Sequence, residues 1–285
     1  MEQGALTSTS TMGVPRRVLV CGDAMSDIYW HGAVGRISPE APVPIITVGA
    51  TERREGAAAN VANNIEAMGV PCERIFGSSK ERIQKIRLLA RKQHVCRIDF
   101  DYPQSPIECD ATYEEALTRC HFVVFVDYGK GSLANIQALI AKAREAKRFT
   151  FVDPRGHDFD KYRGASLLKP NKDEMKELVG GWASQDELDF KVRQFMLAAG
   201  ISEILLTQAA EGMTIYTRHH TEHVASTVTD IADVSGAGEA ALSAYVAAIA
   251  KGYAANYALE YANKAAGLCI SRFGTVVLTN AEVFG

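Results

Sequence analysis

The sequence predicts an α/β protein with a doubly wound, mostly parallel sheet, helices on both of its faces, and a small β-lid. Three observations support this fold class. From Tyr113 onward, helical and strand-like segments alternate along the chain, which is typical of parallel sheets whose crossovers are helices. Short apolar runs such as residues 122–126 end at polar residues. Residues 28–51 are rich in β-forming residues but broken by prolines, which confine strands to sheet edges and so predict a separate small sheet.

The first strand and the first helix are indicated by their local composition. Residues 17–23 form an apolar run ending in Gly-Asp, which is typical of a buried strand that opens into a functional loop. Small residues at 56–65 begin a helix. The other expected elements are strands at 75–77, 122–126, 149–152, 167–171, 203–207, 214–216, 222–225 and 276–278, and helices at 134–147, 172–179 and, as a pair, within 240–268.

The expected domain organisation is one domain with a tail. Residues 1–13 are rich in Ser, Thr and Gly and predict a flexible N-terminal tail, followed by a single domain over residues 14–285. The lid strands are expected at about 28–50 and 86–100, the second as a hairpin around Lys92-Gln93. Such a lid would cover a ligand bound at the edge of the main sheet.

Composition and charge exclude several classes of protein. The chain has 285 residues, of which 47% are hydrophobic, and a formal net charge of −3. This balance gives no electrostatic reason to expect a nucleic-acid partner. The longest apolar runs have the length of a strand, so no membrane span is expected. The six cysteines are scattered without a CxxC pair, a pattern that favours reduced thiols and a cytoplasmic protein.

The stretch Asp233–Glu239 carries the strongest functional signal. Two glycines in it let the backbone approach a ligand closely, and an Ala-rich helical segment follows directly. The first turn of a helix has unpaired N–H groups and a partial positive charge, so Gly236, Ala237 and Gly238 predict an anion site. Glu239 is a candidate general base in the same turn, a pairing that suits phosphoryl transfer to a hydroxyl. The alternative is a tight loop that only begins a helix.

Four polar residues in the first quarter of the chain are further candidates. Asp27 follows the first strand closely and either contacts a sugar hydroxyl or has no role in binding. Arg36 lies between the expected lid strands and is either a solvated charge or faces a phosphate on the substrate. Asn60 and Asn64 are four residues apart and share one helix face. Paired Asn residues at a helix start favour hydrogen bonding to a substrate over packing alone.

Polar residues also follow several strands of the predicted parallel sheet. Ligands of such sheets bind at the carboxyl ends of strands, so these side chains are expected to meet at one edge. They are Asp127, Asp153, Asn171, Glu174 and Thr207. Asn171 and Glu174 either hold a hydrated Mg²⁺ through oxygen atoms or form the capping box of the helix that follows.

Two motifs make the chain resemble the ribokinase-like (PfkB) carbohydrate kinases from about Arg17 to the C-terminus. Residues 56–62, Gly-Ala-Ala-Ala-Asn-Val-Ala, are similar to the first signature of the family, and residues 233–239 are similar to its second signature. Within the family, the closest resemblance is to the heptose 7-phosphate kinases of lipopolysaccharide-precursor synthesis. The segments that carry it are residues 22–30, 36–44 and 127–131.

The resemblance implies an enzyme that uses ATP and Mg²⁺ to phosphorylate the anomeric hydroxyl of a seven-carbon sugar phosphate. It places Glu239 at the position of the catalytic Asp, and the Asn171/Glu174 pair at the Mg²⁺ and phosphate site. It implies an anion hole formed by Gly236, Ala237 and Gly238. It implies sugar-side positions at Asp27, Asn60, Lys85 and Asp127, and nucleotide-side positions at Thr207, Gly212, Ser235 and Asn263. It also implies a homodimer formed through the lid strands.

Three departures from the family pattern lead to a second hypothesis. Glu239 replaces the family's Asp, which moves the carboxylate by about 1 Å, and such shifts can slow an enzyme ~100-fold. The segment between Gly77 and Lys85 is too short for a further crossover and strand. Gln208 stands where the family's nucleotide loop has a basic residue. The alternative function is therefore that of a catalytically impaired paralogue serving as a binding or structural subunit.

Overall fold

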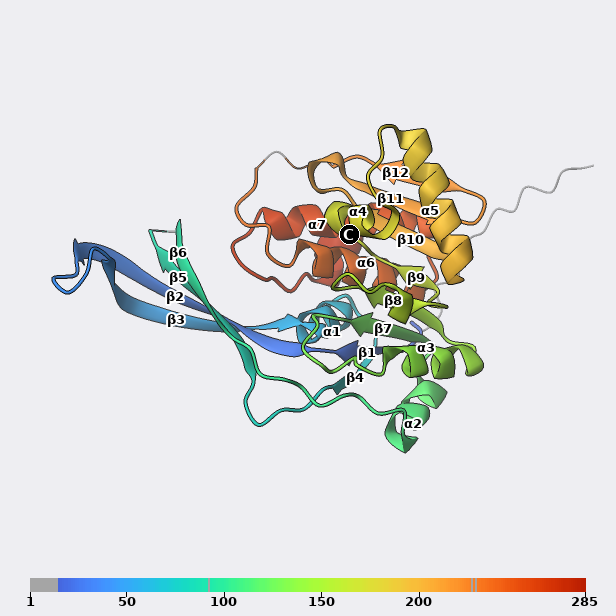
Figure 1. The fold of residues 1–285 in the computed structure, drawn as a ribbon, viewed down its shortest axis with the longest axis horizontal. Coiled ribbons are helices and arrows are strands. Elements are labelled where there is room, and N and C mark those ends of the chain that lie inside the picture. Colours follow the sequence, from blue (N-terminus) through green and yellow to red (C-terminus); the bar gives the residue numbers. More distant parts are fainter. Residues whose placement is uncertain (1–14, 92, 227, 229) are drawn as a thin grey trace, which may run out of the picture.

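The computed structural model describes residues 15–91, 93–226, 228 and 230–285. The predicted tail at 1–13, and Lys92 of the predicted hairpin, lie outside these residues. The described chain forms two sheets (Figure 1). An eight-stranded sheet forms the body, and a four-stranded sheet, here called the lid sheet, projects from one side of it.

The body sheet is mostly parallel, as the sequence predicts. Its strand order is β12-β11-β10-β9-β8-β7-β1-β4, and near one edge β11 pairs antiparallel with both β10 and β12. β1 and β7 pair with each other inside the sheet and are fully buried, which explains why they read as unbroken apolar runs. The strands are β1 (Val18–Gly22), β4 (Cys72–Phe76), β7 (Phe122–Val126), β8 (Phe149–Asp153), β9 (Leu167–Leu168), β10 (Glu203–Thr207), β11 (Met213–Thr217) and β12 (Thr221–Val224).

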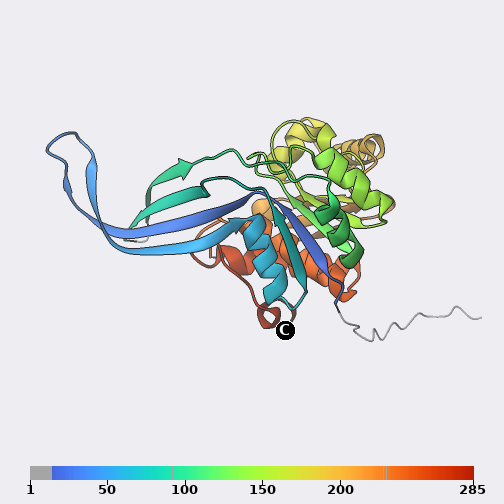
Figure 2. The ribbon, with the colours of Figure 1, turned by 90° about the horizontal axis from the view of Figure 1, so that it is seen from below.

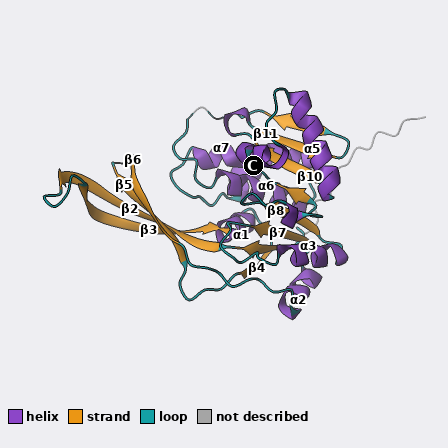
Figure 3. Ribbon diagram, viewed as in Figure 1, coloured by secondary structure: helices purple, strands orange, loops and turns teal. Residues whose placement is uncertain are grey.

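Helices cover both faces of the body sheet (Figure 3). Side chains of β1 alternate between the two layers, because Val18 and Val20 pack into one core, and Leu19 and Cys21 into the other. One layer consists of α1 (Ala58–Ala67), α6 (Ala237–Lys251), α7 (Ala255–Ile270) and α8 (Asn280–Phe284). The other consists of α2 (Ala111–Arg119), α3 (Ile136–Glu145), α4 (Lys172–Val179) and α5 (Gln185–Ala199). Single 3₁₀ turns occur at Asp160–Tyr162 and Ala209–Glu211.

The lid sheet is built from two antiparallel hairpins, and Figure 2 shows it extending away from the body. Its strand order is β3-β2-β5-β6, with β2 and β5 parallel. The strands are β2 (Ala24–Ile37), β3 (Pro44–Ala57), β5 (Ile83–Ala90) and β6 (Gln93–Phe100). Residues of β6 are exposed throughout. The buried side chains of the lid sheet lie instead on β2, β3 and β5, and at its base Met25, Ala57 and Ile83 form a buried apolar cluster.

The end of the chain differs from the prediction. Residues 276–278 form no strand, and the short helix α8 follows them. The reason is that the side chain of Asn64 forms hydrogen bonds with backbone groups of this segment. Its Nδ2 donates to the Val276 carbonyl at 3.0 Å, and its Oδ1 accepts from the Leu278 N–H at 2.8 Å. Backbone groups bonded to a side chain are not available to a neighbouring strand.

At the other edge of the body sheet, β4 is the last strand, and residues 77–82 lead directly from it into the lid sheet. The sequence predicts that the segment between Gly77 and Lys85 is too short for a further crossover and strand, and the structure has neither in the described residues between β4 and β5. None of the helices within the described residues is both long and apolar enough to span a membrane.

Candidate active site

The first turn of α6 is shaped by glycines. Gly236 is its N-cap and has a φ of 79°, a left-handed conformation that glycine adopts without strain. No side chain of the described residues caps this turn. A Cβ added to Gly238 would lie 3.2 Å from the Lys169 ammonium, so the absence of a side chain there keeps the turn open. The turn thus has the open, uncapped geometry that the predicted anion site requires.

Glu239 is buried in that turn, with 6% of its surface exposed. Its Oε1 accepts a hydrogen bond from the Tyr128 hydroxyl, and its Oε2 accepts one from Asn60 Nδ2 at 2.5 Å. Burial raises the pKa of Glu239 to about 7, against the lowering effect of these two hydrogen bonds. A carboxylate that titrates near neutral pH is suited to take a proton and later release it.

A cavity of about 160 Å³ opens in front of Glu239. It gathers polar side chains from the carboxyl ends of β7, β8 and β9 and from the first turns of α4 and α6. The structure thus brings together seven of the predicted residues, Asp127, Asp153, Asn171, Glu174, Gly236, Gly238 and Glu239. The full lining is Asp127, Tyr128, Asp153, Pro154, Arg155, Lys169, Asn171, Glu174, Gly236, Gly238 and Glu239.

A second, mainly apolar cavity of about 210 Å³ adjoins the first, and Gly238 lines both. Three residues predicted on the nucleotide side line it, namely Thr207, Gly212 and Asn263, together with Ala237 and Gly238 of the predicted anion hole. Gly212 has a φ of 99°, and a Cβ there would lie 2.0 Å from the Val224 carbonyl oxygen, so only glycine fits. Asn263 donates its Nδ2 to the Ala225 carbonyl at 2.9 Å, which ties α7 to this wall. An apolar cavity beside an anion site has the character of a nucleotide pocket.

Ser235 helps to shape the turn before α6, because its N–H donates to Asp233 Oδ1 at 2.9 Å.

Asn64 is enclosed by the protein. It is fully buried, and its Nδ2 donates to the Asn60 side-chain oxygen at 3.0 Å as well as to Val276. These bonds occupy its amide, so Asn64 positions Asn60 instead of facing the cavity. Asn60 in turn contacts Glu239.

On the lid side, Asp27 is 3% exposed and accepts from the Arg87 guanidinium. The Lys85 ammonium lies 4.9 Å from the centre of the Tyr128 ring, and burial lowers the pKa of Lys85. Lys85 thus lies against Tyr128 from the side of the lid sheet. Arg36 does not join them, because it pairs with Ile45 in the outer part of β2, beyond Gly32, where the pairing with β5 ends.

The loop after β7 is held by a buried aspartate. Asp23 is fully buried and accepts from the backbone N–H groups of Tyr128, Lys130 and Ser132 at 2.9, 3.0 and 3.1 Å. In the same loop, Asp127 accepts from the Lys161 ammonium and the Tyr162 hydroxyl, both at 2.7 Å. Asp23 therefore fixes the loop that presents Tyr128 to Glu239.

This arrangement agrees with a match between the chain and a known family. The profile of the family described as "pfkB family carbohydrate kinase" matches residues 124–281. The chain belongs to this family. It is therefore a carbohydrate kinase, which confirms the expected enzyme class and does not favour the alternative of a structural subunit.

Two relatives and one solved structure locate the kinase more closely. A D-β-D-heptose 7-phosphate kinase of Bordetella bronchiseptica is 36% identical over 298 residues, which cover 94% of this chain and 95% of that protein. A bifunctional protein HldE of Pseudomonas putida is 38% identical over 295 residues, and the match covers 93% of this chain but only 62% of that protein. Ribokinase of Arabidopsis thaliana, solved with ribose and ATP, gives a TM-score of 0.77 at 16% identity, covering 95% of this chain and 98% of that one. That likeness confirms the predicted ribokinase-like fold.

The Asn171/Glu174 pair of the kinase forms the capping box of α4. Asn171 Oδ1 accepts from the N–H groups of Asp173 and Glu174 at 2.9 Å, and Glu174 Oε2 accepts from the Asn171 N–H at 2.8 Å. Burial raises the pKa of Glu174, which still lines the cavity. Within the described residues, no cluster of three His, Cys, Asp or Glu side chains could hold a metal. Mg²⁺ keeps several waters and binds one or two carboxylates together with phosphates, so Glu174 and Asp153 fit an ion delivered with a nucleotide.

The lid sheet contacts the anion site through the loop after α7. Arg54 of β3 donates to the Phe273 and Thr275 carbonyls at 2.8 and 2.7 Å, and the Tyr29 hydroxyl of β2 accepts from the Thr275 N–H at 3.0 Å. The Gly274 N–H between them donates to Asp233 at 3.0 Å. Asp233 also accepts from Ser235, so one chain of contacts leads from the lid to the turn before α6.

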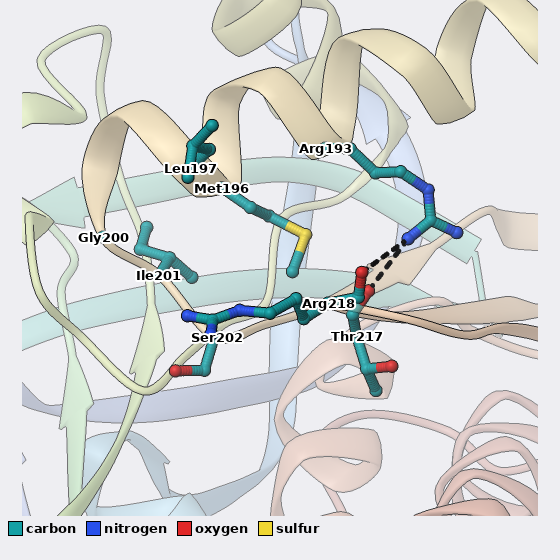
Figure 4. Close-up of a pocket in the computed structure, with 8 residues that line it drawn as sticks. All are labelled: Arg193, Met196, Leu197, Gly200, Ile201, Ser202, Thr217 and Arg218. Atoms are coloured by element: carbon teal, nitrogen blue, oxygen red, sulfur yellow. Dashed lines mark hydrogen bonds between the residues drawn. The ribbon is translucent and has the colours of Figure 1, made fainter.

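A further pocket, between the end of α5 and β11, contains none of the predicted site residues (Figure 4). Of its two arginines, Arg193 donates to the carbonyls of Thr217 and Arg218 at 3.1 and 3.3 Å and thereby braces the strand end. Such a brace is structural. The lining is Arg193, Met196, Leu197, Gly200, Ile201, Ser202, Thr217 and Arg218.

Sequence reasoning missed Tyr128 and Lys169 as site residues. Tyr128 follows Asp127 at the end of β7, so its place after a buried strand was a usable signal. Lys169 follows β9 in the same way, but a lone lysine before Pro170 is an ordinary surface residue in most sequences. Here its side chain is 5% exposed.

Proposed function

We propose that this kinase transfers the γ-phosphoryl group of ATP to a hydroxyl of a sugar phosphate, with heptose 7-phosphate as the acceptor, in the supply of lipopolysaccharide precursors. The observation that carries the proposal is the position of Glu239. It lies in the turn of α6 where the polar and apolar cavities meet, and its pKa is about 7. The near full-length similarity to the Bordetella bronchiseptica kinase supports the acceptor.

The two cavities suggest how ATP binds. The adenosine would occupy the apolar cavity beside Thr207, Gly212 and Asn263, and the phosphates would extend past Gly238 to the first turn of α6. There the N–H groups and the helix dipole stabilise negative charge. Mg²⁺, held by Glu174 and Asp153, would neutralise charge on the phosphates.

The acceptor would lie under the base of the lid sheet, among Asp27, Asn60, Lys85 and Asp127. Its hydroxyl would replace the Tyr128 hydroxyl at Glu239 and donate its proton to that carboxylate as the oxygen attacks the γ-phosphorus. Asn60 would keep the carboxylate oriented through its bond to Oε2. Lys85 and Arg36 are proposed to face the phosphate of the acceptor, Arg36 only if the outer lid bends toward the body.

We further propose a homodimer that forms through the lid sheets. The support is the set of large apolar side chains that the lid exposes, because such side chains on one sheet favour burial against a second copy. They are Val34, Ile37, Val43, Val48, Val95, Ile98 and Phe100. A cytoplasmic location is proposed because all six cysteines are free and ATP is supplied there. Sedimentation equilibrium at micromolar concentration tests the dimer, and a monomer would contradict it.

An ADP-release assay over a panel of sugars and sugar phosphates tests the proposed reaction. We expect the highest kcat/KM with heptose 7-phosphate and Mg²⁺-ATP. Replacing the base by Glu239→Gln should lower kcat by about 10²- to 10⁴-fold, because a positioned general base contributes that much. Glu239→Asp keeps a carboxylate and should retain or raise turnover.

Two results would contradict the proposal. Faster release of ADP with another sugar would give the kinase a different acceptor. A Glu239→Gln protein as fast as the wild type would remove Glu239 as the base. Folding of each variant is checked by circular dichroism, so that a loss of rate is not confused with a loss of structure.

A further inference from the structure

Lys169 is a buried lysine in the polar cavity. It lies between β9 and Asn171, and its backbone N–H donates to the Val152 carbonyl at 2.8 Å, which fixes the residue beside β8. The residue is 4% exposed, yet it lines the cavity in front of Glu239. Its ammonium is close to the first turn of α6, 3.2 Å from where a Cβ of Gly238 would stand. An enclosed cation at the mouth of a helix calls for a physical reason.

Burial of an ammonium is costly unless other groups compensate its charge. Within the described part of the chain, the one ion pair of Lys169 is with Asp153, whose Oδ1 lies 2.9 Å from Nζ. Neutralising Asp153 would be a sufficient role if the pair lay in the core. Instead both residues line the cavity that also contains Gly236, Gly238 and Glu239. The ammonium and the α6 turn therefore present positive charge to the same space.

The other polar groups of the site do not supply this charge as closely. In the described part of the nucleotide loop, Thr207–Met213, there is no Lys or Arg, and Gln208 is hydrogen-bonded to Thr214 on the side of a different pocket. Arg155 lines the cavity but is exposed. Lys161 is paired with Asp127 and is not part of the lining. Lys169 is thus the enclosed cation nearest to the predicted anion hole.

We propose that Lys169 is a catalytic residue whose ammonium binds oxygen atoms of the phosphoryl group during its transfer. The inference rests on the proposed kinase reaction. The acceptor oxygen forms a bond to the γ-phosphorus while the bond to the β–γ bridging oxygen breaks, and that electron pair leaves with ADP. The acceptor proton passes to Glu239. Lys169 keeps its own protons and stabilises the charge that develops on the phosphoryl and leaving oxygens. Asp153 holds the ammonium in place.

Two substitutions separate the charge of Lys169 from its bulk. Lys169→Met keeps the apolar stem, and Lys169→Gln also leaves Asp153 with a hydrogen-bonding neighbour. We expect kcat to fall by about 10²- to 10³-fold in both, the usual effect of removing one group that stabilises transition-state charge. Lys142→Met is the matched control, because Lys142 pairs with Glu114 on the surface, away from the cavity, and its loss should leave kcat unchanged.

Calorimetric titration with two nucleotides gives a second readout that needs no turnover. AMP-PNP carries a γ-phosphoryl group and ADP does not. Lys169→Gln should lose about 10-fold or more in affinity for AMP-PNP, the effect expected from one charge-assisted hydrogen bond. Its affinity for ADP should stay near that of the wild type.

The outcomes distinguish this inference from the proposed function. A folded Lys169→Gln protein with wild-type kcat overturns the role of Lys169 alone, as does an equal loss of affinity for AMP-PNP and ADP. A wild-type protein that releases no ADP with any sugar phosphate overturns the proposed reaction instead. In that case the AMP-PNP and ADP titrations still decide whether Lys169 binds a terminal phosphate.

Discussion

The edge of the body sheet and the lid sheet are both part of the proposed active site, but they are constructed differently. The body edge is enclosed, with Asp23, Lys169 and Glu239 all nearly or fully buried and bonded to groups from distant segments. In the lid sheet, β6 is exposed along its whole length, and its base holds the only buried apolar cluster found there among the described residues.

This difference indicates that the two substrates meet different kinds of site. The nucleotide and phosphate groups would bind to a preformed edge that is fixed by buried hydrogen bonds. The acceptor would bind partly to a sheet whose outer strand β6 is exposed and whose position depends on the residues that tie it to the body. Variants at matched positions in the two regions test this contrast.

The largest expected effect is on stability and lies in the body. Asp23→Ala should lower the free energy of unfolding by about 3–5 kcal/mol, because three backbone N–H groups, one buried and two partly buried, lose the buried carboxylate that accepts from them. Asp99→Ala in the lid is the matched control. Its pair with Arg97 is exposed, so about 1 kcal/mol or less is expected. Urea denaturation measures both, and equal losses would contradict the contrast.

The second prediction concerns the pH dependence of stability in the body. The folded protein holds the proton of Glu239 up to a pKa of about 7, whereas the ordinary value is 4.5. Because the folded state binds this proton more tightly, its contribution to stability is full at low pH and is lost as the pH rises toward 7. The loss is on the order of 3 kcal/mol.

Denaturation of wild type and Glu239→Gln at several pH values between 4 and 8 checks this prediction. The difference between the two proteins should change with pH in favour of the variant, since glutamine does not titrate. If the difference in unfolding free energy between the two proteins stays constant over this range, burial does not raise the pKa of Glu239. The same titration predicts that kcat/KM of the wild type rises with pH up to about 7.

The smallest expected effect tests the tie between the regions. Arg54→Met removes two hydrogen bonds from β3 to the loop after α7 and should lower kcat/KM for the acceptor about 10-fold, with little change in Tm. Arg53→Met is the matched control, because Arg53 is the next residue along β3 and donates only to Ser26. If both variants have the same kcat/KM, the lid does not act through Arg54.

The parts of the molecule that local sequence determines could be predicted. The strands at 122–126 and 203–207 and the helix at 172–179 are found with the expected bounds, because apolar runs and capping residues are local signals. The glycine turn at the start of α6 could also be predicted, since the glycines and the helix start are contiguous. The resemblance to the pfkB family then supplied the enzyme class.

The roles that depend on distant contacts could not be predicted. Asn64 was expected to face a substrate, but its amide binds Val276, 212 residues away. Lys169 gains its position from its ion pair with Asp153 and from the first turn of α6 beside Gly238, neither of which a local pattern reports. That Arg36 faces a phosphate of the substrate stays a prediction, because Arg36 lies in the outer part of β2, beyond the residues that pair with β5.

The hydrogen bonds of Glu239 also bear on how the kinase would avoid wasting ATP. Both oxygens of this carboxylate are already bonded, one to Tyr128 and one to Asn60. A water molecule that reached the terminal phosphate would therefore find the base engaged and would be a poor nucleophile. A sugar that displaces the Tyr128 hydroxyl frees the base at the moment when a productive acceptor is present. Tyr128 would in this way suppress futile hydrolysis between encounters with the sugar.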